Sequence, residues 1–164
     1  MKCSTIIAAS SLALVSAGNC SLPQINLGHF SFPHTNMFVA WSPYTPTTIQ
    51  ELDDVCVKAG AIKGTATWTA VRTASTYTSG PICGNPFNIT SDETGVTYRN
   101  LELACSDDNS EGLATQVTAI VDATSQTTVQ TCTPVLVDGQ PFRLGDGCSN
   151  YRGSSLSFDF ACSL

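Results

Sequence analysis

The chain has 164 residues, of which 12% are charged, and its formal net charge at pH 7 is −6. Its seven Lys and Arg residues form no basic run. This argues against nucleic acid, which is bound largely through phosphate neutralisation, and against anionic membrane surfaces. The length suits one domain with a real hydrophobic core.

The N-terminus has the pattern of a secretory signal peptide. Lys2 precedes an apolar run over residues 6–15, and Ser16-Ala17 supplies small residues for a signal peptidase. The run is too short to span a bilayer, and no later stretch is apolar enough to do so, so we expect no membrane insertion. We expect a leader of residues 1–17 and a secreted, extracellular β-rich domain of residues 18–164. Removal of Lys2 would change the net charge from −6 to −7.

The cysteines are disulfide candidates because exported proteins fold in oxidising compartments. The sequence has no Cys-x-x-Cys pair, and its two histidines, His29 and His34, are far in sequence from every cysteine except Cys20. Zinc sites usually use closely spaced ligand pairs, so we favour disulfides and expect no metal and no cofactor. Six cysteines are expected to pair in an order that the sequence leaves open. These six are Cys56, Cys83, Cys105, Cys132, Cys148 and Cys162.

The position of the signal cleavage decides whether the mature chain has an odd or an even number of cysteines, and Cys20 is the residue concerned. A cut after Ala17 leaves seven cysteines, whereas a cut after Cys20 leaves six. With seven, Cys20 is a free thiol or links two copies. The expected product is therefore a monomer, or a dimer through Cys20.

Hydrophobic periodicity predicts one helix and several strands. Residues 24–32 and 36–41 are the first two strands. Residues 48–59 place apolar side chains at helical spacing, with Thr47 or Thr48 as the cap and Gly60 as the stop. Residues 61–78 alternate with period two, as in one long strand or two joined by a bend.

The second half of the chain contains further strand patterns. Residues 87–90 and 96–105 flank a turn and predict a hairpin, and residues 116–122 and 127–137 are rich in β-branched side chains. Asp138-Gly139 is a strong two-residue turn signal before residues 141–144. In residues 155–162, Leu156, Phe158, Phe160 and Cys162 are expected to share one face. The predicted fold is α+β, a mostly antiparallel, disulfide-stapled sandwich or partly open barrel with one helix near residues 48–59.

Few residues in the sequence indicate a modification, metal-binding or catalytic site. Asn88-Ile89-Thr90 is an N-glycosylation sequon, and Asn19-Cys20-Ser21 is a formal match that a bridged Cys20 would hinder. The segment 107–112 resembles the first half of a calcium loop, but Thr118 stands where the loop requires Glu, so a solvated acidic turn is favoured. His29 and His34 are the only candidates for a catalytic base, and no acidic residue is tied to either by spacing. We expect no enzyme activity and assign no catalytic residues.

The surface-binding candidates are two aromatic residues in a Pro-rich turn and a pair in a later loop. They are Trp41, Tyr44, Tyr151 and Arg152. Aromatic side chains more often belong to the core, and Trp68 in mid-strand is assigned there.

The short leader, the spaced cysteines and the missing enzyme motif resemble fungal small secreted cysteine-rich proteins, the class from which plant-pathogen effectors are drawn. Two segments, residues 87–106 and 147–160, are also similar to the fungal major-allergen β-barrel family. That likeness implies an antiparallel β fold and transfers no functional residue.

We expect a secreted, non-enzymatic effector that serves as a virulence or avirulence factor by binding a host protein or a wall-associated macromolecule. In a plant-associated fungus it would act in the apoplast. A carbohydrate or cell-wall binding module is the alternative, and a small secreted hydrolase using His29 or His34 is the third hypothesis.

Overall fold

The architecture comes from a computed structural model. It describes residues 22–32, 35–55, 57–58, 61–62, 69–75, 82–91, 93–106, 117–144 and 153–164.

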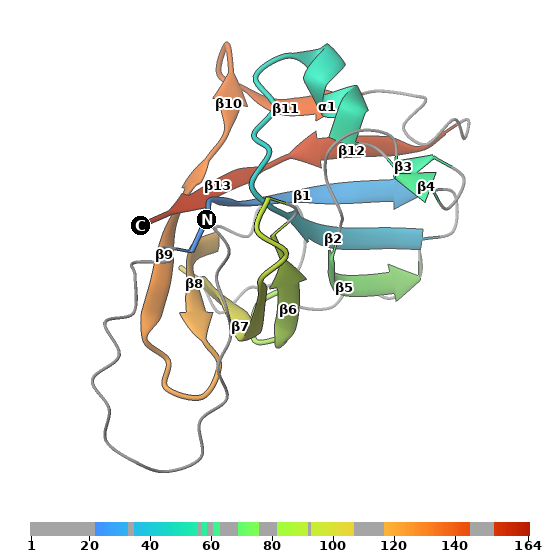
Figure 1. Ribbon diagram of the computed structural model, residues 1–164. Coiled ribbons are helices and arrows are strands. Elements are labelled where there is room, and N and C mark those ends of the chain that lie inside the picture. Colours follow the sequence, from blue (N-terminus) through green and yellow to red (C-terminus); the bar gives the residue numbers. More distant parts are fainter. Residues whose placement is uncertain are drawn as a thin grey trace.

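One large antiparallel sheet and one short helix dominate the described part of the chain (Figure 1). The helix α1 spans Ile49–Val55, and a separate two-stranded ladder joins β3 (Val57–Lys58) to β4 (Ala61–Ile62). The strands of the large sheet are β1 (Ile25–Phe32), β2 (Thr35–Trp41), β5 (Thr69–Ser75), β6 (Phe87–Thr90), β7 (Thr97–Cys105), β8 (Val117–Asp122), β9 (Thr128–Pro134), β10 (Leu136–Val137), β11 (Gln140–Leu144), β12 (Ser155–Phe158) and β13 (Phe160–Ser163).

The sheet curls into a nearly closed barrel. Its hydrogen-bonded path runs β10-β11-β12-β1-β13-β9-β8-β7-β6, and β2 pairs with both β1 and β5. Strands β5 and β6 approach each other, but no ladder between described residues joins them. The predicted antiparallel β fold with one helix is therefore confirmed, in its partly open barrel form.

Two hydrophobic clusters lie on opposite faces of β1. Ile25 and Leu27 contribute to the larger cluster, which includes Leu103, Ile120 and Phe160. Phe30 contributes to the second cluster, which lies under α1. Because successive side chains of a strand point to opposite faces, β1 supplies apolar residues to both clusters.

Helix α1 begins as predicted but is shorter. The Glu51 N–H donates to Thr48 Oγ1 over 3.2 Å, and the Thr48 N–H donates to Glu51 Oε2 over 3.2 Å, which forms a capping box. The expected extent, residues 48–59, is wrong at its C-terminal end, because Val57 and Lys58 pair with β4. This part of the chain is too short for hydrophobic periodicity to distinguish a last helical turn from a short strand.

The expectation for residues 155–162 needs a correction. Instead of one face, the apolar residues serve both clusters: Leu156 and Phe158 pack under α1, whereas Phe160 and Cys162 pack in the larger cluster. The change occurs at Asp159, whose N–H donates to the Leu27 carbonyl over 2.9 Å between the end of β12 and the start of β13.

The hairpin between β10 and β11 follows its turn signal. Asp138 has φ of 52° and Gly139 has φ of 74°. Positive φ at both central residues is what a tight hairpin turn of this type requires, and Asp and Gly tolerate it.

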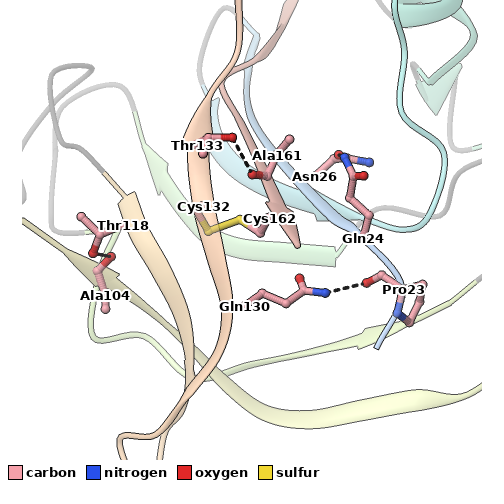
Figure 2. The surroundings of a disulfide bond; sticks show 10 residues. All are labelled: Pro23, Gln24, Asn26, Ala104, Thr118, Gln130, Cys132, Thr133, Ala161 and Cys162. Atoms are coloured by element: carbon pink, nitrogen blue, oxygen red, sulfur yellow. Dashed lines mark hydrogen bonds between the residues drawn. A yellow bond between two sulfur atoms is a disulfide. The ribbon is translucent and has the colours of Figure 1, made fainter. Parts of the chain in front are cut away.

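Among the described residues, two disulfides link strands of the sheet. Cys132 of β9 and Cys162 of β13 lie directly opposite each other, with their Cα atoms 4.0 Å apart (Figure 2). Cys83 precedes β6 and is bonded to Cys105 at the end of β7. Cys132 and Cys162 are buried, whereas Cys83 and Cys105 are half-buried.

We predict that the two bridges differ in their susceptibility to reduction under native conditions. Because solvent access limits attack by a thiolate, Cys83 and Cys105 should be reduced and alkylated before Cys132 and Cys162. Peptide mapping after timed exposure to mild reductant measures the order. Equal rates without denaturant would contradict the prediction, and denaturant should abolish the difference.

Candidate functional site

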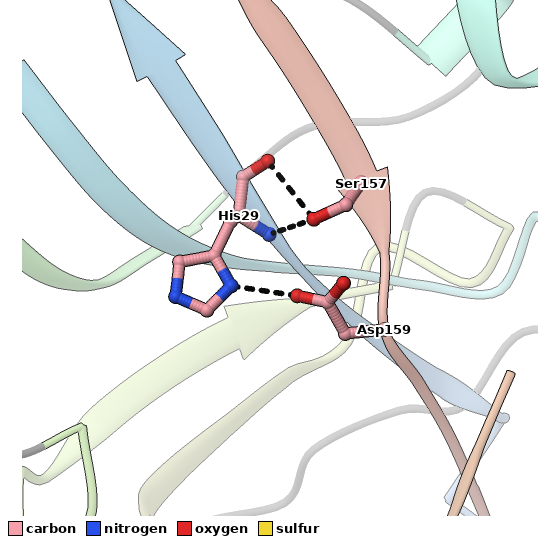
Figure 3. Close-up of polar contacts among 3 residues, drawn as sticks. All are labelled: His29, Ser157 and Asp159. Carbon is pink, nitrogen blue, oxygen red and sulfur yellow. Dashed lines mark hydrogen bonds and ion pairs between the residues drawn. The ribbon is translucent and has the colours of Figure 1, made fainter. Parts of the chain in front are cut away.

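The most distinctive polar arrangement joins β1 to the junction of β12 and β13. His29 Nδ1 lies 2.6 Å from Asp159 Oδ2, although the two residues are 130 positions apart in the sequence (Figure 3). The side chains retain 24% and 16% of their exposure, respectively. The pair is therefore partly shielded yet open to solvent.

The contact defines which nitrogen of His29 carries the proton. A carboxylate offers only acceptors, so Nδ1 must donate to Asp159. In the neutral ring the lone pair then lies on Nε2, to which no described residue is hydrogen-bonded. The ring also meets Phe38 edge-on, with centroids 4.7 Å apart, which restricts its orientation.

Ser157 lies beside the pair but does not complete a catalytic triad. Its Oγ accepts the backbone N–H of His29 over 3.1 Å and donates to the backbone carbonyl of His29 over 3.5 Å. The residue is 3% exposed. A serine nucleophile must instead be hydrogen-bonded to the free imidazole nitrogen, so Ser157 is a structural partner of β1.

The site therefore supplies one oriented base. An imidazole held by a carboxylate can accept a proton from water or a hydroxyl, or donate its lone pair to a cation. The described residues contain no cluster of three or more His, Cys, Asp or Glu side chains that could hold a metal ion.

The sequence analysis named His29 but missed Asp159. Nothing in the local pattern signals this partner, because the contact depends on how β1 pairs with the C-terminal strands. The other histidine candidate, His34, lies outside the described residues.

Trp41 is not a surface residue, which corrects its assignment as a binding candidate. Its side chain is 0% exposed, packs at 5.4 Å centroid distance from Phe158, and donates from Nε1 to the Tyr44 carbonyl over 2.8 Å. An indole inside a core needs such a partner for its N–H. Tyr44 is half-buried against the same cluster, and Tyr151 and Arg152 lie outside the described residues.

Asn88 occupies the outer face of β6. Its side chain is exposed, and its Oδ1 accepts the backbone N–H of Asn100 over 2.9 Å. The sequon threonine, Thr90, is exposed on the same strand, and its hydroxyl lies 2.8 Å from that of Thr97.

Four of the six disulfide candidates form the two bridges described above. Cys56 and Cys148 lie outside the described residues, as do Cys20 and the acidic segment 107–112.

Two partly exposed carboxylates have lowered pKa values for structural reasons. Hydrogen bonds from the hydroxyl and N–H of Thr47 lower the pKa of Glu51 at the start of α1. The N–H and hydroxyl of Ser125 lower the pKa of Asp122 in the turn between β8 and β9. Both groups stabilise local turns as anions, which does not suit a general acid at neutral pH.

No helix in the described ranges is long and apolar enough to cross a membrane. Comparisons with protein-family models, curated proteins and solved structures returned no match.

We predict that the His29–Asp159 contact stabilises the fold. Asp159→Ala should lower the free energy of unfolding by about 1–2 kcal/mol, because it removes a charge-assisted hydrogen bond. Asp159→Asn should lower the free energy of unfolding by less, since the amide oxygen of the new side chain still accepts a hydrogen bond from His29 Nδ1. Urea denaturation of both variants measures the difference.

A double-mutant cycle with His29→Ala isolates the pairwise energy. We expect a coupling of about 1 kcal/mol between the two sites. A coupling near zero would show that the contact adds nothing to stability.

Proposed function

We propose that the chain is a secreted, non-enzymatic, effector-like glycoprotein of fungal type that acts by binding a host protein or a wall-associated macromolecule. The observation that carries the proposal is the buried Cys132–Cys162 bridge, which ties the last strand of the chain to β9. Disulfides of this kind form and persist in oxidising compartments, including the extracellular space.

The arrangement of the sheet supports a binding role. Its interior is filled by apolar side chains, so a macromolecular partner would meet the outer face. The outer face of β9 and β13 presents hydroxyl groups, with Thr131, Thr133 and Ser163 exposed and Thr131 directly opposite Ser163. Rigid strands hold such groups in fixed positions, which lowers the entropic cost of binding.

Export and biological role are tested together. Tagged full-length protein should appear in the culture medium of its source organism with its leader removed, and a deletion strain should colonise its host less well. Retention of the protein in the cells would contradict the export proposal. Unchanged colonisation of both susceptible and resistant hosts would contradict the effector role.

The kind of partner is tested by retention on insoluble chitin, glucan and cellulose. The double variant Thr131→Ala/Thr133→Ala should weaken retention, and the control Thr128→Ala should leave it unchanged. This result would identify a polysaccharide as the partner and the outer face of β9 and β13 as the binding surface. No retention on any of the three would contradict a cell-wall module and favour a host protein.

A second candidate function is hydrolysis of activated esters, and the 2.6 Å contact between His29 and Asp159 favours it. His29 Nε2 would take a proton from water as the water oxygen attacks the acyl carbon. The same proton would pass to the departing alkoxide, yielding a carboxylic acid and an alcohol. Glycoside cleavage would instead need two carboxyl groups facing one bond.

We predict for this candidate that the protein hydrolyses p-nitrophenyl acetate faster than an equal concentration of free imidazole. His29→Gln should abolish the excess rate, and Asp159→Asn should lower it about 10-fold or more because the ring loses its oriented carboxylate. A rate equal to that of free imidazole, or one unaffected by His29→Gln, would rule out this mechanism.

A further inference from the structure

The sequon side chains share one face of β6. Burial along this strand alternates, with Phe87 and Ile89 at 5% and 1% exposure and Asn88 and Thr90 exposed. Alternation places residues two apart on the same side of a strand. The acceptor Asn88 and the hydroxyl residue of its sequon therefore lie together on the outside of the sheet, while Ile89 anchors the strand in the larger hydrophobic cluster.

The carboxamide of Asn88 is held in one orientation. Its Oδ1 accepts the backbone N–H of Asn100 over 2.9 Å, at a position where the β6–β7 register shifts. An amide nitrogen cannot replace Oδ1 there, because it would face another N–H donor. The Nδ2 group consequently points away from this hydrogen bond.

Asn100 is itself fixed by further contacts. It has φ of 58°, its carbonyl accepts the N–H of Ala123 over 2.8 Å, and its Nδ2 donates to Thr124 Oγ1 over 2.8 Å. The residue whose N–H orients Asn88 is therefore itself held by hydrogen bonds between β7 and the β8–β9 turn. These bonds fix the position of the donor to the Asn88 carboxamide.

We propose that Asn88 carries an N-linked oligosaccharide, attached at Nδ2, that lies over the exposed end of β6. This inference rests on the proposed export, because the modification is added in the secretory pathway. N-linkage replaces one hydrogen of Nδ2 and leaves Oδ1 free to accept, so the glycosylated side chain keeps its hydrogen bond to Asn100.

The position of β6 gives the oligosaccharide a physical role. This strand ends the hydrogen-bonded path of the large sheet, and its only ladder among the described residues is with β7. Strand β5 approaches it without such a ladder. A strand edge that lacks a ladder is a template for pairing with another chain, and proteins commonly cover or interrupt it. A hydrated oligosaccharide beside this edge hinders the approach of a second molecule.

The test uses the full chain with its leader, expressed in a eukaryotic secretory host. Protein from the medium is digested with peptide N-glycosidase in heavy-oxygen water, which marks each formerly glycosylated asparagine as labelled aspartate. We expect the label at Asn88. Protein in the medium without label at Asn88 would overturn the inference while leaving export intact, whereas absence from the medium would contradict export itself.

Three variants separate the sugar from the side chains. Thr90→Ala should remove the glycan without altering Asn88, and Thr97→Ala should keep the glycan while removing the same hydroxyl contact. Asn88→Asp should remove the glycan but keep an acceptor for the Asn100 N–H. Retention of the mark at residue 88 in Thr90→Ala, or its loss in Thr97→Ala, would contradict the assignment.

The covering role is measured by light scattering after size-exclusion chromatography over a range of concentrations. Asn88→Asp and Thr90→Ala should self-associate at lower concentration than the wild type and Thr97→Ala. Identical profiles for glycosylated and unglycosylated forms would overturn the covering role.

Discussion

The structure depends on β1 being hydrogen-bonded along both edges and packed on both faces. Strand β2 pairs with one edge, while the other edge pairs first with β13 and then with β12. Gly28 lies at this change of partner, and a Cβ atom there would collide with the backbone carbonyl of Ser157. A glycine is required because the two backbones approach too closely for any side chain. The ladder with β12 then continues under α1, and the ladder with β13 continues into the barrel.

The candidate site is a product of the same branch point. His29 follows Gly28, and Asp159 is the residue between β12 and β13, so the pairing that divides the sheet also brings imidazole and carboxylate together. The N-terminal side of β1 is held separately. Buried Gln130 donates to the Pro23 carbonyl over 2.9 Å, and Ser42 Oγ donates to the Gln24 carbonyl over 2.7 Å. The segment that enters β1 is thus held by polar contacts of its own, separate from the His29–Asp159 pair in the middle of the strand.

Local patterns predicted most elements, because caps, turns and strand periodicity act over a few residues. The Thr48–Glu51 capping box and the Asp138-Gly139 turn are examples. The C-terminal strand shows the limit of this reasoning: its alternation is real, but the break at Asp159 between β12 and β13 divides its apolar residues between different clusters. The same limit explains Trp41 and the His29–Asp159 pair. A Pro-rich neighbourhood suggested exposure for the indole, and no spacing rule links positions 130 residues apart.

The Cys132–Cys162 bond has a consequence for backbone cleavage. It closes a covalent ring around β10, β11 and β12. If a protease cuts one peptide bond within this ring, the two fragments stay joined, and β13 remains next to β9. Strand β13 also pairs with β1, so the bond continues to anchor the centre of the sheet in a nicked molecule. A protein built this way tolerates a single cut in a protease-rich surrounding without losing its C-terminal strand.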